Sequence, residues 1–291
     1  GPATAISTNT RLKRVLGIVP VAEDGSYYFE APPGKALYFQ LLDENKLVLQ
    51  SMRSWVNLMP GERRGCVGCH EGRNNTLETA KSINFAYREP DQIEPPSWGV
   101  KTLSYVDDIQ PIFDKNCAEC HQGEGKAREK LDLTLRPDKH NRWGGIFPEP
   151  YITLTCGDNP VNNEAYGTHL LNPTIAGNFF IWSTAYNTMP AMTKWSYRSP
   201  LINLVMHGNE NHDLKLSEEE LGILTAWVDT NCHFRSLKDV LDIDDPDPNW
   251  FLNWPFPPQL SSAPYVNRLY SQEEFNSPSD RATLRSRHPS E

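Results

Sequence analysis

The hydrophobic residues at positions 11–60 recur in the pattern of short β-strands. Four runs, RVLGIVPV, SYYFEA, KALYFQLLD and KLVLQSMRSWVNL, are rich in β-branched and aromatic residues, and the turn-forming sequences EDG, PPG and DEN separate them. Turn residues at this spacing between apolar runs are typical of β-hairpins. We therefore predict a small antiparallel sheet or sandwich of about four strands in residues 1–60, with a scaffolding role.

Two later stretches carry apolar residues at helical spacing. In SYVDDIQPIFDKNC the apolar face consists of Val106, Ile109, Ile112 and Phe113, and Pro111 limits the regularity of this helix. In LSEEELGILTAWVDTN, Ser217 and Glu220 have the spacing of a capping box. The apolar face that follows consists of Leu221, Leu224, Trp227 and Val228. We expect these two helices to pack on each other.

The pentapeptide Cys-x-x-Cys-His occurs twice, at Cys66, Cys69 and His70 and again at Cys117, Cys120 and His121. Two thiols at this spacing reach the vinyl groups along one edge of a haem, and the histidine that follows is delivered to the iron. The alternatives are a zinc site or a thioredoxin-like dithiol, but zinc ribbons need no histidine after each cysteine pair. The sequence therefore predicts two covalently attached haem c groups, with the four cysteines as attachment points and the two histidines as axial ligands.

Net charge and the two remaining cysteines limit the binding partners and the cellular compartment that we expect. The chain has 28 Lys and Arg against 37 Asp and Glu, a net charge of −9, which argues against nucleic-acid binding. No apolar run is long enough to span a membrane. Because bacteria attach haem to thiols outside the cytoplasmic membrane, we expect a periplasmic or secreted protein with a redox protein as partner. In that oxidising setting Cys156 and Cys232 are expected to form a disulfide, the alternative being two buried thiols.

These features divide the chain into four predicted segments: a β-rich scaffold module (1–60), a first haem-binding segment (61–104), a cytochrome c-like domain with the second haem (105–245), and a tail rich in Pro and aromatic residues that packs on the body (246–291). A long, loop-rich insertion spans roughly residues 122–199. The expected fold class is α+β, a small antiparallel β module followed by loop-rich, mainly α, cytochrome c-like haem domains.

Each predicted iron also needs a group on its second face. For the second iron, the candidates that precede the last helix are Met189, Met192, His207 and His212. A Met-Pro pair such as that in NTMPAM supplies the methionine ligand in many cytochromes c, although a lone methionine is often core filler.

The loop that follows the first motif contains no His, Met or Tyr, so its iron must be capped from a distance or left open. His140 and His169, both in the insertion, are the unassigned histidines in the body of the chain. We prefer His169, because THLL places it in an apolar run that can bury against a porphyrin. An insertion that reaches back in this way would hold both haems in one compact unit.

Residues 24–71 include the first motif. Residues 199–231 contain a His-Asp pair, then an apolar-Lys-Leu-Ser run and a Trp-x-Asp helix. Both stretches resemble hydrazine synthase alpha-subunit-like proteins. The resemblance covers most of residues 14–235. It implies a middle domain and a C-terminal domain with one haem each, usually behind an N-terminal propeller that residues 1–291 do not include. It also implies two histidine ligands for the second haem and aligns His212-Asp213 with the ligand region, so we choose His212.

The sequence departs from this family after the first motif. The resemblance implies a five-coordinate, catalytic first haem with a tyrosine close to the motif, but here the chain reads EGRNN, and the next tyrosine is Tyr87. Asn74 is a poor iron ligand, so hydrazine chemistry is not expected to carry over.

Two functions stay open on the sequence. We favour a di-haem c-type cytochrome that carries electrons, as a module of a larger redox assembly. The alternative is a haem enzyme that acts on a small nitrogen or oxygen substrate at an open first haem, either hydrazine synthase-like or peroxidase-like. Only residues 71–116 separate the two motifs, which is too short for one complete cytochrome domain before the next and argues against the peroxidase.

Overall fold

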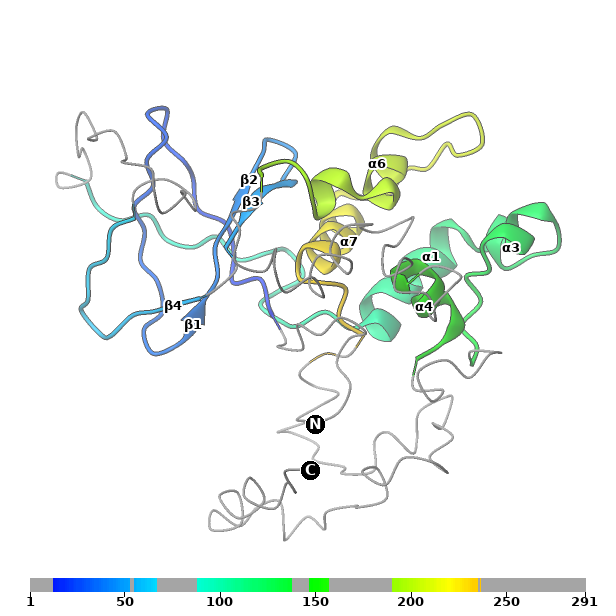
Figure 1. Cartoon of the computed structure of the whole chain (residues 1–291), viewed down its shortest axis with the longest axis horizontal. Helices are drawn as coiled ribbons and strands as arrows, with labels where there is room; N and C mark the ends of the chain where they lie inside the picture. Colours follow the sequence, from blue (N-terminus) through cyan, green and yellow to red (C-terminus); the bar gives the residue numbers. More distant parts are fainter. Residues whose placement is uncertain are drawn as a thin grey trace, which may run out of the picture.

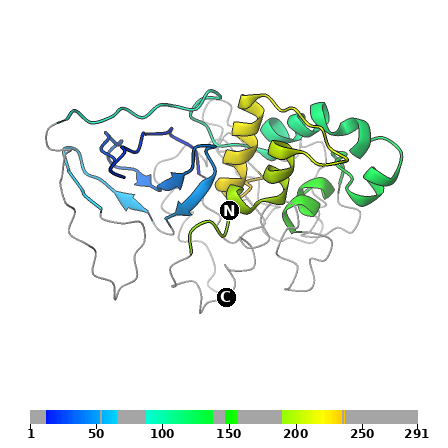
Figure 2. The same ribbon diagram turned by 90° about the horizontal axis from the view of Figure 1, so that it is seen from above.

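The computed structural model describes residues 13–52, 55–66, 88–137, 147–156, 190–234 and 236. These residues form a β-rich part and a helical part that lie side by side (Figures 1 and 2). The β-rich part precedes the helices along the chain, so the predicted α+β fold class is confirmed. None of the helices in the described residues has the length and apolar character needed to cross a membrane.

The β-rich part contains four short strands in the described residues, β1 (Ala36–Leu37), β2 (Gln40–Leu42), β3 (Val48–Ser51) and β4 (Val56–Asn57). They form two antiparallel pairs, β1 with β4 and β2 with β3. The turn between β2 and β3 is the predicted DEN turn. The Asp43 carboxylate closes it by accepting hydrogen bonds from the backbone N–H groups of Asn45 (2.9 Å) and Leu47 (2.8 Å).

The first two predicted strands are wrong. RVLGIVPV and SYYFEA join no sheet, and each makes a single backbone bridge to the segment 88–95, at Ile18 with Glu94 and at Phe29 with Asp91. The physical reason is proline, since Pro20 lies in the first run and the facing segment reads REPDQIEPP. Proline lacks the N–H that a continuous ladder of hydrogen bonds needs.

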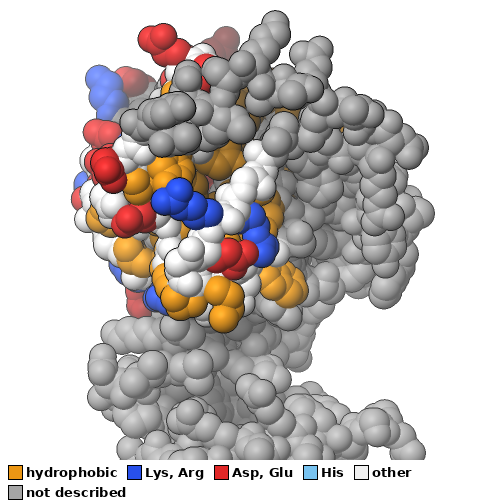
Figure 3. Space-filling view, turned by 90° about the vertical axis from the view of Figure 1, so that its left-hand side faces the viewer, with side chains coloured by type: hydrophobic (Ala, Val, Ile, Leu, Met, Phe, Trp, Pro, Cys, Tyr) orange, Lys and Arg blue, Asp and Glu red, His pale blue; other side chains and the backbone are white. Residues whose placement is uncertain are grey.

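Several apolar side chains stay exposed on the β-rich part. Trp55 is 53% exposed and Met59 is 66% exposed. Seen from this side of the molecule, apolar side chains are interspersed with Lys, Arg, Asp and Glu (Figure 3).

The helical part contains a π-helical turn η2 (Tyr105–Ile109), a 3-10 turn η5 (Ser196–Arg198), and the α-helices α1 (Gln110–Asn116), α2 (Ala118–His121), α3 (Lys126–Lys130), α4 (Glu149–Cys156), α6 (Pro200–His207) and α7 (Glu218–Asp229). Pro111 lies in the first turn of α1, directly after the π-turn, and its missing N–H interrupts the hydrogen-bond ladder at this point. The predicted helix therefore begins as a π-turn and continues as a regular α-helix.

Helix α7 begins with the predicted capping box. The Ser217 hydroxyl accepts a hydrogen bond from the Glu220 backbone N–H (3.2 Å), and the Glu220 carboxylate accepts one from the Ser217 backbone N–H (2.8 Å). These bonds satisfy two N–H groups that a helix start leaves unpaired. The capping box fixes the point at which the chain leaves the preceding loop and enters the core.

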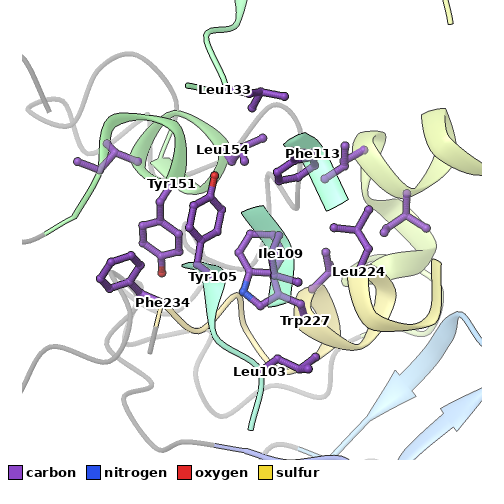
Figure 4. Close-up of a cluster of buried hydrophobic side chains, with 14 of the residues drawn as sticks. Leu103, Tyr105, Ile109, Phe113, Leu133, Tyr151, Leu154, Leu224, Trp227 and Phe234 are labelled. Carbon is purple, nitrogen blue, oxygen red and sulfur yellow. The ribbon is translucent and has the colours of Figure 1, made fainter. Parts of the chain in front are cut away.

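The hydrophobic core forms where η2 and α1 pack on α7 (Figure 4). Tyr105 and Trp227 are fully buried, with ring centroids 5.7 Å apart. Ile109 and Leu224 are buried completely as well. Burying one such side chain contributes about 1.5–3 kcal/mol. The predicted contact between the helix before the second motif and the last helix is therefore present.

A network around Asp229, the last residue of α7, joins the helical part to the β-rich part. Its carboxylate accepts a hydrogen bond from the Ser196 backbone N–H (2.8 Å), and its backbone oxygen accepts one from Gln40 Nε2 of β2 (3.0 Å). The Ser196 hydroxyl in turn accepts from the Val48 N–H of β3 (2.9 Å). Burial raises the pKa of Asp229 to about 7. Helix α7 lies between the strands and α1 (Figures 1 and 2).

The raised pKa of Asp229 predicts how the free energy of unfolding depends on pH. Between 3.8 and about 7 the folded chain keeps a proton on Asp229 that the unfolded chain releases, so this carboxyl lowers the free energy of unfolding as the pH rises through that window. Asp229→Asn keeps an acceptor for Ser196 but cannot ionise. We expect its stability relative to the wild type to rise by roughly 2–3 kcal/mol from pH 5 to pH 8.

Urea unfolding of both proteins at the two pH values measures this difference, and all other titrating groups cancel in the comparison. A stability difference that is the same at pH 5 and pH 8 would contradict the prediction.

Candidate haem site in the helical domain

The second Cys-x-x-Cys-His motif lies at the junction of α1 and α2. Cys117 ends α1, with its N–H donating to the Phe113 oxygen (2.8 Å), and α2 begins at the next residue. Cys120 and His121 are therefore presented from one short helix, and Cys120 is exposed. Because α1 packs in the core, the motif is held at a fixed position relative to α7.

Cys117 is partly buried against the core. Burial raises the pKa of its thiol to about 11, and the neighbouring Cys120 adds to this effect. Before a haem is attached, the Cys117 sulfur is therefore a neutral thiol at pH 7. The motif places its two sulfur atoms three residues apart, at the positions that thioether bonds to one haem edge require.

The chain turns tightly after the motif and returns beside it. Gly123 makes this turn, because a Cβ at that position would lie 2.6 Å from the Glu119 oxygen. The returning segment then holds the histidine of the motif: His121 Nδ1 is 2.8 Å from the Leu131 carbonyl oxygen. A carbonyl oxygen only accepts, so Nδ1 carries the proton and Nε2 keeps its lone pair. The His121 ring is thus prepared to bind a metal through Nε2.

His212 lies opposite His121. The ring centroids are 6.1 Å apart and the ring planes differ by 15°. Zinc–imidazole bonds are about 2.0–2.1 Å long and iron–imidazole bonds are similar, so two imidazoles on opposite faces of one metal have centroids about 6 Å apart. His212 Nδ1 is 2.9 Å from Asn209 Oδ1, which leaves Nε2 of this ring available as well. The centroid separation of the two rings therefore matches that of two axial ligands of one haem iron.

Both histidine-bearing segments are anchored to the same core. Leu131, whose carbonyl oxygen contacts His121, packs against the core with its side chain. Leu214 and Leu216, which follow His212, pack against the same core. Helix α6 ends five residues before His212, and α7 begins six residues after it. The distance between the two rings is therefore set by helix packing as well as by the loop itself.

The other candidates for the sixth ligand lie elsewhere. Met192 is at the junction with the β-rich part, where its N–H donates to the Leu49 oxygen (2.7 Å), and its side chain is 44% exposed. His207 is the last residue of α6 and is exposed. Met189 lies outside the described residues. Among the described candidates, the structure brings His212 next to His121.

The first motif is described only at its start. Cys66 is exposed, whereas Cys69 and His70 lie outside the described residues. Cys66 lines an open groove of about 3140 Å³, together with Arg63, Phe39 and other residues of the β-rich part and with residues of α7 such as Leu221. This is larger than the roughly 300–1,000 Å³ of most small-ligand pockets. The groove extends over much of the β-rich part and onto α7, and Cys66 is one of its lining residues.

Three further predicted groups also lie outside the described residues. These are His140, His169 and the side chain of Cys156. The capping of the first haem by His169 and the disulfide between Cys156 and Cys232 therefore stay predictions.

Sequence reasoning missed two residues that position His212. Gly208 has a φ of +67°, and a Cβ there would lie 2.6 Å from the His212 oxygen. Asn209 contacts the His212 ring through its side chain. The Gly-Asn pair that follows His207 is a turn signal from which this tight loop could have been predicted.

Two family models match the chain. Residues 2–71 match the hydrazine synthase alpha subunit middle domain, and residues 106–231 match cytochrome c. The first match ends just past the first Cys-x-x-Cys-His motif. The second includes the second motif and His212. No solved structure matches the chain.

One curated relative is the hydrazine synthase subunit alpha of Kuenenia stuttgartiensis. It is 20% identical over 279 residues, which cover 77% of this chain and 33% of the relative. The chain thus spans about a third of that protein's length. The resemblance to hydrazine synthase alpha subunits is confirmed, and the chain is a haem c protein whose cytochrome c domain lies in residues 106–231.

Proposed function

We propose that this protein is a di-haem c-type cytochrome that carries electrons. The observation that carries the proposal is the pair of facing imidazoles, His121 and His212, with ring centroids 6.1 Å apart. An iron that has a protein ligand on both faces has no open position for a substrate, and it exchanges electrons without binding one.

The residues of the second motif have separable roles in this proposal. Cys117 and Cys120 would hold the haem by thioether bonds, while His121 and His212 would bind the iron through Nε2. When bound, the haem supplies an iron that alternates between two oxidation states. The Leu131 oxygen and Asn209 Oδ1 hold the two rings in place through Nδ1. Rings that are held in this way move little between the two states, which favours rapid electron transfer.

The first haem is proposed on Cys66, Cys69 and His70. The repeated pentapeptide supports it, and so does the groove beside Cys66. His169 is our proposed cap for its second face. With both haems closed, electrons would pass from one to the other and then to a redox partner protein.

A haem enzyme with an open first haem is the second candidate. The observation that favours it is the match of residues 2–71, which include the first motif, to the middle domain of a synthase subunit. In this reading the first iron binds a small nitrogen or oxygen substrate, and the second haem supplies or removes electrons.

We also propose a periplasmic or extracellular location and a place in a larger redox assembly. Covalent haem attachment supports the location, and a disulfide between Cys156 and Cys232 would suit it. The relative from Kuenenia stuttgartiensis is named a subunit, which supports the assembly.

The haem count is tested by the intact mass of the purified protein. We expect a mass that exceeds the polypeptide by two haems. Replacing Cys66 and Cys69 by alanine should remove one haem, and replacing Cys117 and Cys120 should remove the other. Cys232→Ala is the control that keeps both. A wild-type mass with a single haem would contradict the di-haem assignment.

The ligation by His212 is tested by absorption spectroscopy. His212→Ala should convert one haem from low-spin to high-spin, because the iron loses its sixth ligand. His207→Ala, an exposed histidine five residues earlier, is the matched control and should keep the wild-type spectrum. A low-spin spectrum with a methionine-type charge-transfer band that survives in His212→Ala would show that another residue binds the iron.

The choice between electron carrier and enzyme is tested with carbon monoxide. The reduced wild type should leave carbon monoxide unbound, because both irons are closed. His169→Ala should open the first haem and bind it, whereas His140→Ala should behave like the wild type. If the unmutated protein already binds carbon monoxide at one haem, the enzyme with an open first haem is the better assignment.

A further inference from the structure

We propose that Asn209 is a positioning residue for His212 and sets the reduction potential of the second haem. The inference rests on the proposed ligation of that haem by His212. Asn209 begins the loop that carries His212, and its side-chain oxygen is 2.9 Å from His212 Nδ1. Metal-binding histidines generally donate their second ring N–H to an oxygen atom, which fixes the ring and makes it a stronger electron donor.

The orientation of the Asn209 amide follows from a third residue. The backbone N–H of Asn211 points at the same side-chain atom of Asn209, at 2.9 Å. A backbone N–H only donates, so the atom between Asn211 and His212 must be the amide oxygen and not its nitrogen. His212 Nδ1 must then carry the proton, and its Nε2 keeps the lone pair for the iron. Asn209 therefore determines which tautomer His212 adopts.

The same residue also holds the backbone of the ligand. The Asn209 N–H donates to the His212 oxygen and the His212 N–H donates to the Asn209 oxygen, both at 3.0 Å. Gly208 allows this close turn through its positive φ of 67°. Both the ring and the backbone of His212 are thus hydrogen-bonded to Asn209, so this one residue fixes the direction in which His212 Nε2 points.

The two proposed axial ligands differ in the kind of group that supports them. His121 donates to a backbone carbonyl, that of Leu131, whose strength as an acceptor no side-chain change alters. His212 donates to a side chain, so its electron donation can be changed by a substitution. A carboxylate in this place accepts more strongly than an amide. A stronger acceptor on Nδ1 makes Nε2 a better donor, which stabilises the oxidised iron and lowers the potential.

Two substitutions at Asn209 should therefore shift the potential in opposite directions. Asn209→Asp keeps both hydrogen bonds and should lower the potential of the second haem below that of the wild type. Asn209→Leu removes the acceptor and should raise it. Leucine is preferable to alanine because Asn209 is exposed, and water would take the place of the oxygen beside a smaller side chain.

The experiment is a potentiometric titration of the full-length, haem-loaded protein, followed by absorbance. Asn211→Leu is the matched control, since Asn211 is also exposed and contributes only its backbone N–H. Its potential should equal that of the wild type. A second readout is carbon monoxide binding by the reduced protein, which is not expected in the wild type and should appear at the second haem in Asn209→Leu, since the His212 bond is weaker.

The outcomes separate this inference from the proposed ligation. If His212→Ala keeps a low-spin second haem, His212 is not the ligand and both statements are wrong. If His212→Ala becomes high-spin but both Asn209 variants keep the wild-type potential, only the role of Asn209 is wrong. A shift in the same direction for Asp and Leu would indicate that Asn209 merely maintains the loop, and this result also overturns the inference.

Discussion

The contact between the helix before the second motif and helix α7 is the constraint on which the haem site depends. Tyr105 and Ile109 from η2 and Trp227 from α7 are fully buried in this contact. Helix α1 continues from η2 and ends at Cys117, so packing at one end of the helix positions the motif at the other. Helices α6 and α7 bracket the loop with His212. One apolar interface therefore determines where both imidazoles lie.

The same interface is continued by polar contacts to the residues that follow α7. The Trp227 indole N–H donates to the His233 oxygen (2.7 Å), and the Tyr151 hydroxyl donates to the Cys232 oxygen (2.7 Å). Asn231 and Cys232 have positive φ angles of 73° and 52°. Such angles cost conformational energy for residues other than glycine, so they persist because the surrounding contacts fix them. The chain is thereby turned at the end of α7, and Asp229 faces the strands.

The sequence predicted the helices well where periodicity was regular and less well where it was not. Ile109, Ile112 and Phe113 are buried as expected, but Val106 is only half-buried and Tyr105 takes its place in the core. The reason is the π-turn at 105–109, which contains an extra residue per turn and so rotates the apolar face. A periodicity of 3.6 residues cannot indicate such a turn. The first two predicted strands were wrong for a similar reason, since strand propensity alone does not report whether the partner segment can donate hydrogen bonds.

At the candidate haem site, the sequence pattern is sufficient to predict some of the residues but not the others. Cys117, Cys120 and His121 were found from the sequence because covalent attachment fixes their spacing, whatever the fold around them. The partner histidine has no fixed spacing. Position alone left Met189, Met192, His207 and His212 as candidates, and His212 was chosen from the resemblance to hydrazine synthase alpha-subunit-like proteins. Only the close turn at Gly208 and the packing of Leu214 and Leu216 decide which of them faces His121.

His212, which is placed by a short loop, is also held less firmly than His121, which belongs to the Cys-x-x-Cys-His motif. His121 is joined to a haem-bearing helix and to the Leu131 carbonyl, whereas His212 depends on its short loop and on Asn209. If the two histidines bind one haem as proposed, that haem would open on the His212 side, because the His121 side cannot move without disturbing α1 and the core. The two histidines are attached to the fold in different ways, and this difference determines that His212 is the one that can move.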